Sequence, residues 1–182
     1  VPAFGTTASA AATHAIDICR EDGTSVTEQI SLMESEQLQL THKLLDCSMP
    51  DGGYIKWTSE APLIVSVDST GKIYAHDSSK GAAVRLWIDN DVRTVAIIGP
   101  ALAKTMEKLL FNDKIDIDTM DTEAIVETVR ASMKGIPSNI SDYLIKQLED
   151  KLNSLDTGIT VTLYSADGEV LASDQVRVLV TN

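Results

Sequence analysis

The stretch 54–75 limits what this chain can fold into more than any other part of its sequence. It reads as three short strands joined by two turns, and Gly71 supplies the backbone freedom that the tight turn 68–71 needs. Side chains alternate between the two faces of a strand, so each strand gains one apolar face. The paired apolar residues are Ile55 and Trp57, Val65 and Val67, and Ile73 and Ala75. The stretch therefore predicts a β-rich fold.

Further segments with strand patterns flank this stretch, and turns with Gly, Asn or Asp separate several of them. The predicted strands are 15–20, 27–33, 36–45, 82–89 and 92–98. In 82–89, alternation places Val84, Leu86 and Ile88 on one face and Trp87 on the other. Segment 36–45 also fits a helix, because Gln, Leu and Glu have good helical propensity. The total of about seven short strands is the number expected for an Ig-like sandwich.

One set of residues carries a resemblance to a known family. These residues are Trp57, Val67, Asp68, Gly71, Ile73, Ala75, Gly81, Ala83 and Val84. Over roughly residues 14–98 the chain resembles the bacterial Ig-like domain of group 2. The resemblance implies that Trp57 packs in the core of a sandwich and that 36–45 is a strand. Domains of this family occur in secreted and surface proteins of bacteria and in phage virion proteins, and they share no catalytic residues.

The pattern changes at Gly99-Pro100 from a period of two to about 3.6, which indicates helices. The first predicted helix carries Leu102, Met106, Leu109 and Leu110 on one stripe. A second starts at Asp121 or Thr122 and stops at Gly135, and a third opens at Pro137-Ser138. Segments 159–164 and 170–180 flank a turn and predict a hairpin. We therefore expect an all-β Ig-like sandwich at 14–98, followed by a small α+β domain at 99–182 with three helices and a β-hairpin.

Charge and the start of the chain bear on location. The net charge is −12, with 7 basic and 13 acidic residues through Gly99 and 8 and 14 after it. This balance disfavours nucleic acid and anionic membrane surfaces, which need clustered Lys and Arg. Residues 1–13 are small and uncharged, and Ala8-Ser9-Ala10 fits a signal-peptidase site. We expect a leader or the remnant of a signal peptide, and hence a secreted or cell-surface protein; the alternative is an ordinary N-terminus.

An acidic cluster is the strongest candidate for a metal site. Asp113, Asp116, Asp118 and Asp121 lie just before a predicted helix and resemble the calcium loops of dockerin and EF-hand proteins. Those loops need a Gly at the sixth position and an acidic last ligand, and the Gly is missing here. Acidic residues also favour the positive end of a helix dipole. We therefore expect no metal or cofactor at this cluster.

The two cysteines, Cys19 and Cys47, permit one disulfide in a secreted protein. Cys19 lies near the end of the first predicted strand, and Cys47 lies just past 36–45. Antiparallel pairing of these strands would bring the two thiols together. The competing interpretation is two separate buried thiols.

The aromatic residues Tyr54, Tyr74 and Trp87 are the candidates for an interaction surface, although aromatic content is only 4%. Because Trp87 points away from the predicted sandwich core, we expect the C-terminal half or a partner chain to cover it. The sequence contains no nucleophile elbow of the Gly-x-Ser-x-Gly type and no phosphate-binding loop.

The sequence thus predicts a non-catalytic secreted or cell-surface bacterial protein whose Ig-like module acts as a spacer or as an adhesion and interaction domain. Its partner would be a protein or a cell-wall carbohydrate, with no cofactor and no insertion into a membrane. The alternatives are a phage virion protein that decorates a capsid or tail, and a carbohydrate-binding accessory module.

Overall fold

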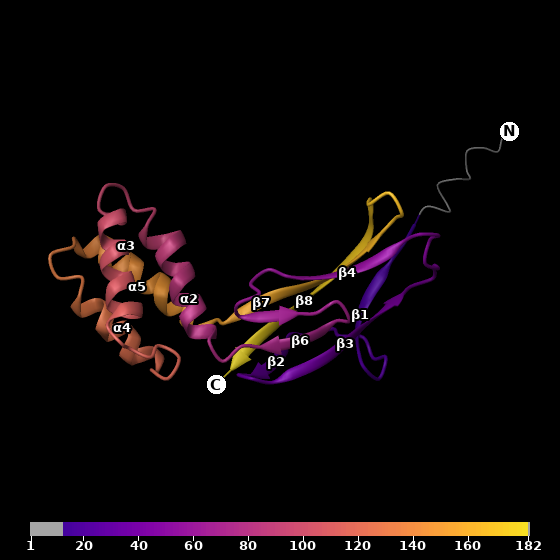
Figure 1. Cartoon of the computed structure of the whole chain (residues 1–182), viewed down its shortest axis with the longest axis horizontal. Coiled ribbons are helices and arrows are strands. Elements are labelled where there is room, and N and C mark those ends of the chain that lie inside the picture. The colour runs from indigo at the N-terminus through magenta and orange to yellow at the C-terminus, as the bar shows by residue number, and fades with distance from the viewer. Residues whose placement is uncertain (1–12, 182) are drawn as a thin grey trace.

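The computed structural model describes residues 13–181, in which two sheets form one part of the molecule and a group of helices the other (Figure 1). The strands are β1 (Ile16–Arg20), β2 (Ile30–Met33), β3 (Gln37–Leu44), β4 (Tyr54–Ser59), β5 (Val65–Val67), β6 (Lys72–Ala75), β7 (Asp156–Tyr164) and β8 (Val170–Thr181). The helices are α2 (Ser79–Trp87), α3 (Gly99–Glu107), α4 (Thr122–Ala131) and α5 (Ser138–Asn153). Two π-helical turns, η1 (Ile88–Val92) and η2 (Lys108–Asn112), extend α2 and α3.

Each sheet has four strands, in the orders β1-β3-β6-β5 and β2-β8-β7-β4. All pairings are antiparallel except that of β2 with β8. The alternating apolar residues of both sheets meet in a core with fully buried Ile18, Leu40, Ile73, Ile159 and Val161. A polar contact also joins the sheets, because the Asp174 carboxylate on β8 accepts the N–H of Ile18 on β1 at 2.8 Å.

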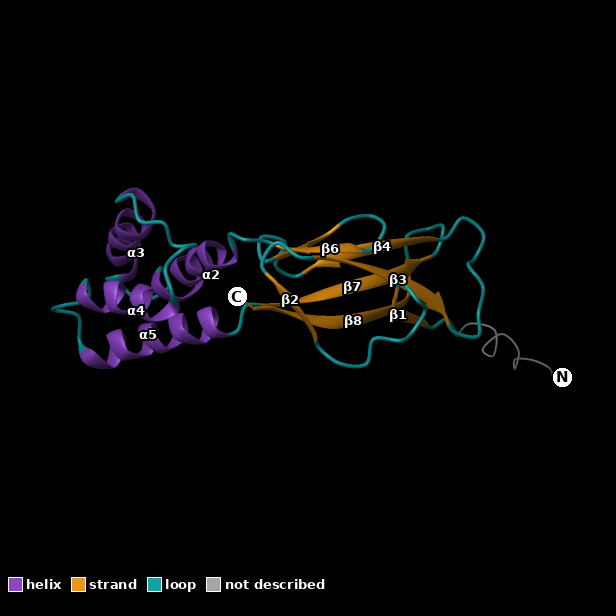
Figure 2. Ribbon diagram, turned by 90° about the horizontal axis from the view of Figure 1, so that it is seen from below, coloured by secondary structure: helices purple, strands orange, loops and turns teal. Residues whose placement is uncertain are grey.

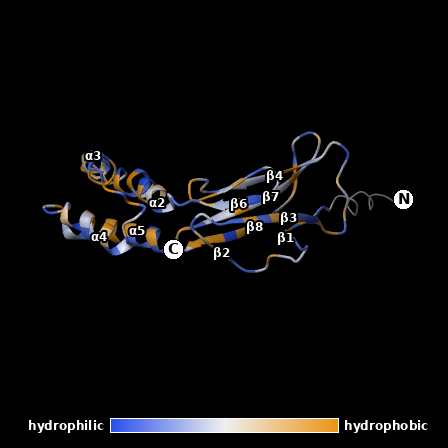
Figure 3. Ribbon diagram, turned by 60° about the horizontal axis from the view of Figure 1, so that its bottom comes forward, coloured by the Kyte–Doolittle hydropathy of each residue, from blue (hydrophilic) through white to orange (hydrophobic). Residues whose placement is uncertain are grey.

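The helices form a second body at one end of the sheets (Figure 2). Each helix is amphipathic, with apolar and polar residues on different faces (Figure 3). Trp87 is fully buried, and its indole N–H donates to the carbonyl of Leu144 on α5 at 2.8 Å. The remaining large, fully buried helical residues are Ile88, Met106, Leu110, Ile125, Leu144, Ile145 and Leu148.

The fold class expected from the sequence, an all-β Ig-like sandwich followed by a separate α+β domain, is wrong. The protein is a mixed α+β fold in which the helical segment, residues 79–153, is inserted between β6 and β7. The C-terminal hairpin does not belong to the helices, because β7 pairs with β4 and β8 pairs with β2. The sequence does not reveal this because the partners of a hairpin are set by contacts between distant parts of the chain.

The strands predicted at 82–89 and 92–98 are also wrong. Residues 82–87 belong to α2, and the chain continues through η1 into turns before α3. The buried residues Ala83, Val84, Trp87 and Ile88 recur at helical spacing, and alanine favours helix. The alternation of Val84, Leu86 and Ile88 was a weaker signal, since Leu86 is exposed.

The other predicted elements agree better with the structure. Segment 36–45 contains strand β3, the second predicted helix begins with Asp121 as its N-cap, and α5 begins at Ser138. Trp57 was expected in the core; it is half buried and packs against the core, so this expectation holds in part. Its indole lies against Gly71, where a Cβ atom would approach it to 2.8 Å. The expected leader falls almost wholly on residues 1–12, which lie outside the described residues.

Trp87→Ala tests the helical core. We expect the variant to lower the free energy of unfolding by about 3–5 kcal/mol, because it leaves a cavity and removes the bond to Leu144. Trp57→Ala serves as the matched control and should cost less, since Trp57 is only half buried. Urea denaturation followed by circular dichroism measures both, and a Trp87→Ala loss no larger than that of Trp57→Ala would contradict the arrangement.

Candidate functional site

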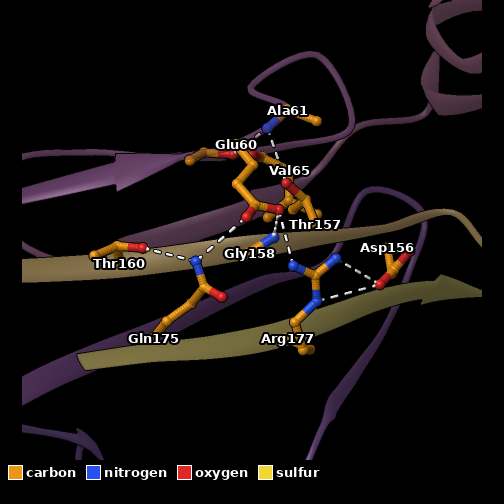
Figure 4. A network of polar contacts seen from close by, with 10 residues as sticks. Glu60, Ala61, Val65, Asp156, Thr157, Gly158, Thr160, Gln175 and Arg177 are labelled. Atoms are coloured by element: carbon orange, nitrogen blue, oxygen red, sulfur yellow. Dashed lines mark hydrogen bonds and ion pairs between the residues drawn. The ribbon is translucent and has the colours of Figure 1, made fainter.

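A network of polar side chains lies where the helical segment joins the sheets (Figure 4). Glu60 follows the end of β4, and its carboxylate accepts the N–H of Gly158 on β7 at 3.1 Å. Arg177 on β8 donates to Glu60 at 2.8 Å and to Asp156 at 2.7 Å. Gln175 donates to Thr160 at 3.1 Å and lies 3.4 Å from Glu60. The network thus joins the loop after β4 to β7 and β8.

Two features let this network form. Gly158 lies directly beneath it, and a Cβ atom there would come within 2.9 Å of Gln175, Glu60 and Arg177. The backbone also connects the two sides, since Glu60 donates its N–H to the Gly158 carbonyl at 3.0 Å. The N–H of Ala61 in turn donates to the buried hydroxyl of Thr157 at 2.9 Å.

The loop 60–64 contacts the outgoing connection to the helical segment and the start of β7, which follows the returning connection. The segment leaves the sheets through residues 76–78 and returns through 154–155. His76 donates its N–H to the Ile64 carbonyl at 3.0 Å, and its ring lies 3.0 Å from the hydroxyl of Ser66. At the return, Leu155 is buried and its carbonyl accepts the N–H of Val180 at 2.7 Å. Both connections are short, and the residues in them that lie next to the sheets are hydrogen-bonded to the sheets, so the helical segment stays close to this end of the sheets.

The electrostatics of the network fit a structural role. The guanidinium of Arg177 and the N–H of Gly158 lower the pKa of Glu60, and the two carboxylates raise the pKa of Arg177. An open hollow of about 200 Å³ lies beside Arg177 and Gln175, lined also by Thr27 and Gln29. Arg177 is already bound to two carboxylates, so it offers this hollow no unpaired cation.

A groove runs along the exposed face of α3 and is the candidate site for binding. Its apolar half is an open hollow of about 410 Å³ between α3 and the α4–α5 connection. Its polar half is a second open hollow, of about 570 Å³. Thr105 lines both, so the two hollows adjoin at this residue. The lining of this α3 groove is Ile97, Ile98, Ala101, Leu102, Ser132 and Ile136 in the apolar half, and Lys104, Glu107, Lys108 and Asn112 in the polar half.

The polar half of the groove carries unpaired positive charge. Glu107 is bound by Arg93 at 2.7 Å and by Arg85 at 3.3 Å, and the Arg85 guanidinium lies 4.1 Å from the centre of the Phe111 ring. Lys104 and Lys108 are exposed on successive turns and form no ion pair among the described residues. The carboxylate of the groove is therefore neutralised, whereas its two lysines remain available.

Ile97 at the edge of the groove is unusual in two respects. Its side chain is 94% exposed, and its backbone has a φ of 64°. A β-branched residue in this left-handed region is strained, at a cost of roughly 1–2 kcal/mol. The protein thus bears both strain and exposed apolar surface at one point beside the apolar half of the groove.

The fold separates charge in a way that the linear sequence hides. Residues 79–153 carry 10 basic and 12 acidic side chains, a net charge of −2, whereas the rest of the chain carries 5 and 15, a net charge of −10. The charge is even between the two halves of the sequence because the boundary at residue 99 cuts through the helical segment. The helical segment is therefore far less acidic than the sheets.

The three predicted aromatic residues of an interaction surface do not come together. Trp87 is buried in the helical core, in line with the expectation that the C-terminal half covers it. It lies on a helix, however, and not on the predicted strand. Tyr74 on β6 packs edge-on against His76. Tyr54 on β4 is exposed but stacks on Tyr164 with ring centres 5.0 Å apart, so one of its faces is already occupied.

Both cysteines are free thiols in the structure, which does not form the predicted bridge. The strands do pair antiparallel, but the register places Cys19 opposite Thr41. Cys47 lies at the other end of β1, with its sulfur 3.5 Å from the Ala15 carbonyl. Burial, followed by the charge of Asp17, raises the pKa of Cys19, which disfavours its reactive thiolate.

Two aspartates of the acidic cluster, Asp118 and Asp121, accept N–H groups in the first turns of helices. Asp121 accepts the N–H of Ala124 at the start of α4, at 2.8 Å. Asp118 reaches across to α2 and accepts the N–H of Gly81 at 3.1 Å, while Lys80 donates to the Met120 carbonyl at 2.9 Å. Residues 13–181 contain no group of three or more His, Cys, Asp or Glu side chains arranged to hold a metal. In the same range, no helix combines the length and apolar character needed to cross a bilayer.

Sequence reasoning missed the residues of both the network and the groove. The only signal was the spacing of Lys104 and Lys108, which places them on one helical face. Nothing in the sequence marks the backbone of Ile97, or pairs Glu60 with Arg177, which is 117 residues away.

Comparisons with known proteins assign no family to this chain. No protein-family model and no curated protein matches the chain. Among solved structures, the chain is similar to the C-terminal 282-residue fragment of intimin in complex with the intimin-binding domain of the translocated intimin receptor. The identity is 13% and the TM-score 0.31, and the match covers 90% of this chain and 30% of that one. A similarity at this level does not establish a shared fold or function, and the resemblance to the group 2 Ig-like family stays a prediction.

The network predicts a pH-dependent contribution to stability. The lowered pKa of Glu60 means that its contribution is full above the unfolded value of about 4.3 and is lost as the pH falls through the lower folded value. Because the pair is exposed, Arg177→Gln should cost at most about 1 kcal/mol at neutral pH. Urea denaturation from pH 7 to pH 3 should show this cost shrinking at the acidic end; a constant difference would refute the assignment.

Ile97→Asn tests the strain in the loop before α3. Asparagine tolerates the left-handed region, so we expect the variant to raise the free energy of unfolding by about 1 kcal/mol. Ile98→Asn is the matched control, because its φ of −83° is ordinary and it should gain nothing. Thermal and urea unfolding measure both. A loss of stability in Ile97→Asn would show that Ile97 is not strained.

Proposed function

We propose that this chain is a non-catalytic interaction module of a secreted or cell-surface bacterial protein, in which the sheets act as a spacer and the helical segment binds a protein through the α3 groove. The observation that carries the proposal is the attachment of the helical segment. Its two short connections are both hydrogen-bonded to the sheet body, and the loop 60–64 contacts both sides of the junction. An attachment of this kind keeps the α3 groove at one end of the sheets.

The arrangement of the elements supports the role of a spacer. β1 begins at the end of the sheets remote from the helices, whereas the helices lie beyond the opposite end (Figure 1). The sheets thus separate the start of the described chain from the α3 groove. Two sheets that share an apolar core and a hydrogen bond between Ile18 and Asp174 make a stiff support.

The properties of the groove support a protein partner. Exposed apolar residues beside polar groups are the usual composition of a protein-binding surface, and strain concentrated at one residue is typical of functional sites. The catalytic alternative has less support, because Glu60, Asp156 and Arg177 neutralise one another and lie in the network that attaches the helices. Secretion is part of the proposal and rests on the Ala8-Ser9-Ala10 motif and on the resemblance to the group 2 Ig-like family.

Selection from a library of random peptides displayed on phage tests the proposal without a known partner. The intact chain is the bait, and the selected peptides are then tested against Ile97→Asp and Ala101→Arg, two changes in the apolar half of the groove. We expect most selected peptides to lose binding to both variants, because binding peptides collect at surfaces built for protein contacts.

Leu63→Asp is the matched control, since Leu63 is also apolar and 66% exposed but lies in the loop 60–64. The selected peptides should bind to this variant as they bind to the unchanged chain. Peptides that are indifferent to Ile97→Asp and Ala101→Arg, or a selection that yields no specific peptide, would argue against a binding function for the groove. Circular dichroism confirms that each variant is folded.

A further inference from the structure

We propose that the partner of the α3 groove is a protein segment in which an apolar side chain is followed by carboxylates. The inference rests on the proposed binding function and adds the chemistry of the ligand. The apolar side chain would enter the half of the groove near Ile97, and the carboxylates would pair with Lys104 and Lys108.

The apolar half selects for a hydrophobic side chain. Its floor is Leu102, which is buried, and its sides are Ile97, Ile98, Ala101 and Ile136. The hydroxyls present, Thr105 and Ser132, already donate within their own helices, to Ala101 at 3.1 Å and to Thr128 at 3.2 Å. An apolar side chain placed here removes apolar surface from water and leaves the donated hydrogen bonds of these two hydroxyls intact.

The polar half selects for negative charge. Arg85 and Arg93 pair with Glu107, and Arg93 also pairs with Asp89, so these ion pairs use both arginines and leave Lys104 and Lys108. The local surplus is the two lysines, on a chain whose net charge is −12. A carboxylate therefore gains attraction at this groove, whereas the acidic sheets repel it.

Helix geometry sets the spacing of the ligand groups. Lys104 lies roughly 5 Å and Lys108 roughly 10 Å further along the axis than Ala101. The carboxylates should follow the apolar side chain by the same distances. A segment that is short enough to lie along α3, with its charge on one side of its apolar residue, meets this requirement.

Other occupants fit less well. Two lysines are too few for the phosphate contacts on which nucleic acids and anionic membranes depend. A second copy of this chain would have to bring its own charge of −12 against that of the first. Like charge on both partners slows association and weakens it, so a separate acidic segment is favoured.

Three synthetic peptides of equal length test the proposal by fluorescence anisotropy against the intact chain. The first carries a leucine pair followed by a glutamate pair, the second replaces the glutamates by lysines, and the third replaces the leucines by serines. We expect only the first to bind, and added salt to weaken it. The double variant Lys104→Glu, Lys108→Glu should weaken the first peptide about tenfold and improve binding of the second.

Lys43→Glu, Lys72→Glu is the matched control, because both lysines are exposed on the sheets, and it should leave the first peptide unaffected. Equal binding of the first two peptides, or no effect of the reversal in the groove, would overturn the proposed chemistry. The binding function itself would survive that result if library peptides of other composition still lose binding to Ile97→Asp. A dimer in sedimentation that the groove reversal dissociates would identify a second copy as the occupant and would also overturn the proposal.

Discussion

The arrangement of the whole molecule depends on the hydrogen-bonded junction around the loop 60–64. Glu60 joins β7 through Gly158 and β8 through Arg177, and the Ile64 carbonyl holds the start of the outgoing connection at His76. These bonds lie at the sheet ends of the two short connections that join the helices to the sheets. The ion pairs are exposed and individually weak, so the junction depends on several contacts acting together. The consequence is that the helical segment, with α3, stays close to this end of the sheets.

Backbone strain and unpaired positive charge both occur at the α3 groove of the helical segment. Ile97 adopts a backbone conformation that disfavours its own side chain, and it leaves that side chain almost fully in water. In the polar half of the same groove, Lys104 and Lys108 form no ion pair with any residue in 13–181, while two arginines neutralise Glu107. Each feature lowers the stability of the free protein or gains it nothing. A bound segment with apolar and acidic groups would use all of them, which explains why they lie in one groove.

Local patterns predicted much of the fold. The three strands of 54–75 are β4, β5 and β6, the terminal hairpin is β7 and β8, and Asp121 caps α4 as its position indicated. One error arose in 82–89, where the same residues fit both the two-residue period of a strand and the 3.6-residue period of a helix. Another arose where the prediction depended on which strands pair with one another, as in the C-terminal hairpin. Cys19 and Cys47 do lie on or beside paired strands, but the register of β1 with β3 separates them. The interaction surface was the least predictable part. The sequence shows that Tyr54, Tyr74 and Trp87 are aromatic, but it does not show which other residues cover each of them.

The sequence by itself determined the type of most elements, the acidic character of the chain and the turns at its glycines, because these depend on residues that are close together along the chain. Only the tertiary structure decided that the helices interrupt the sheets, that Glu60 and Arg177 meet, and that the charge is concentrated in the sheets. The physical reason is that strand pairing and ion pairs join residues more than a hundred positions apart. No local pattern records which of the possible partners will give the lowest free energy.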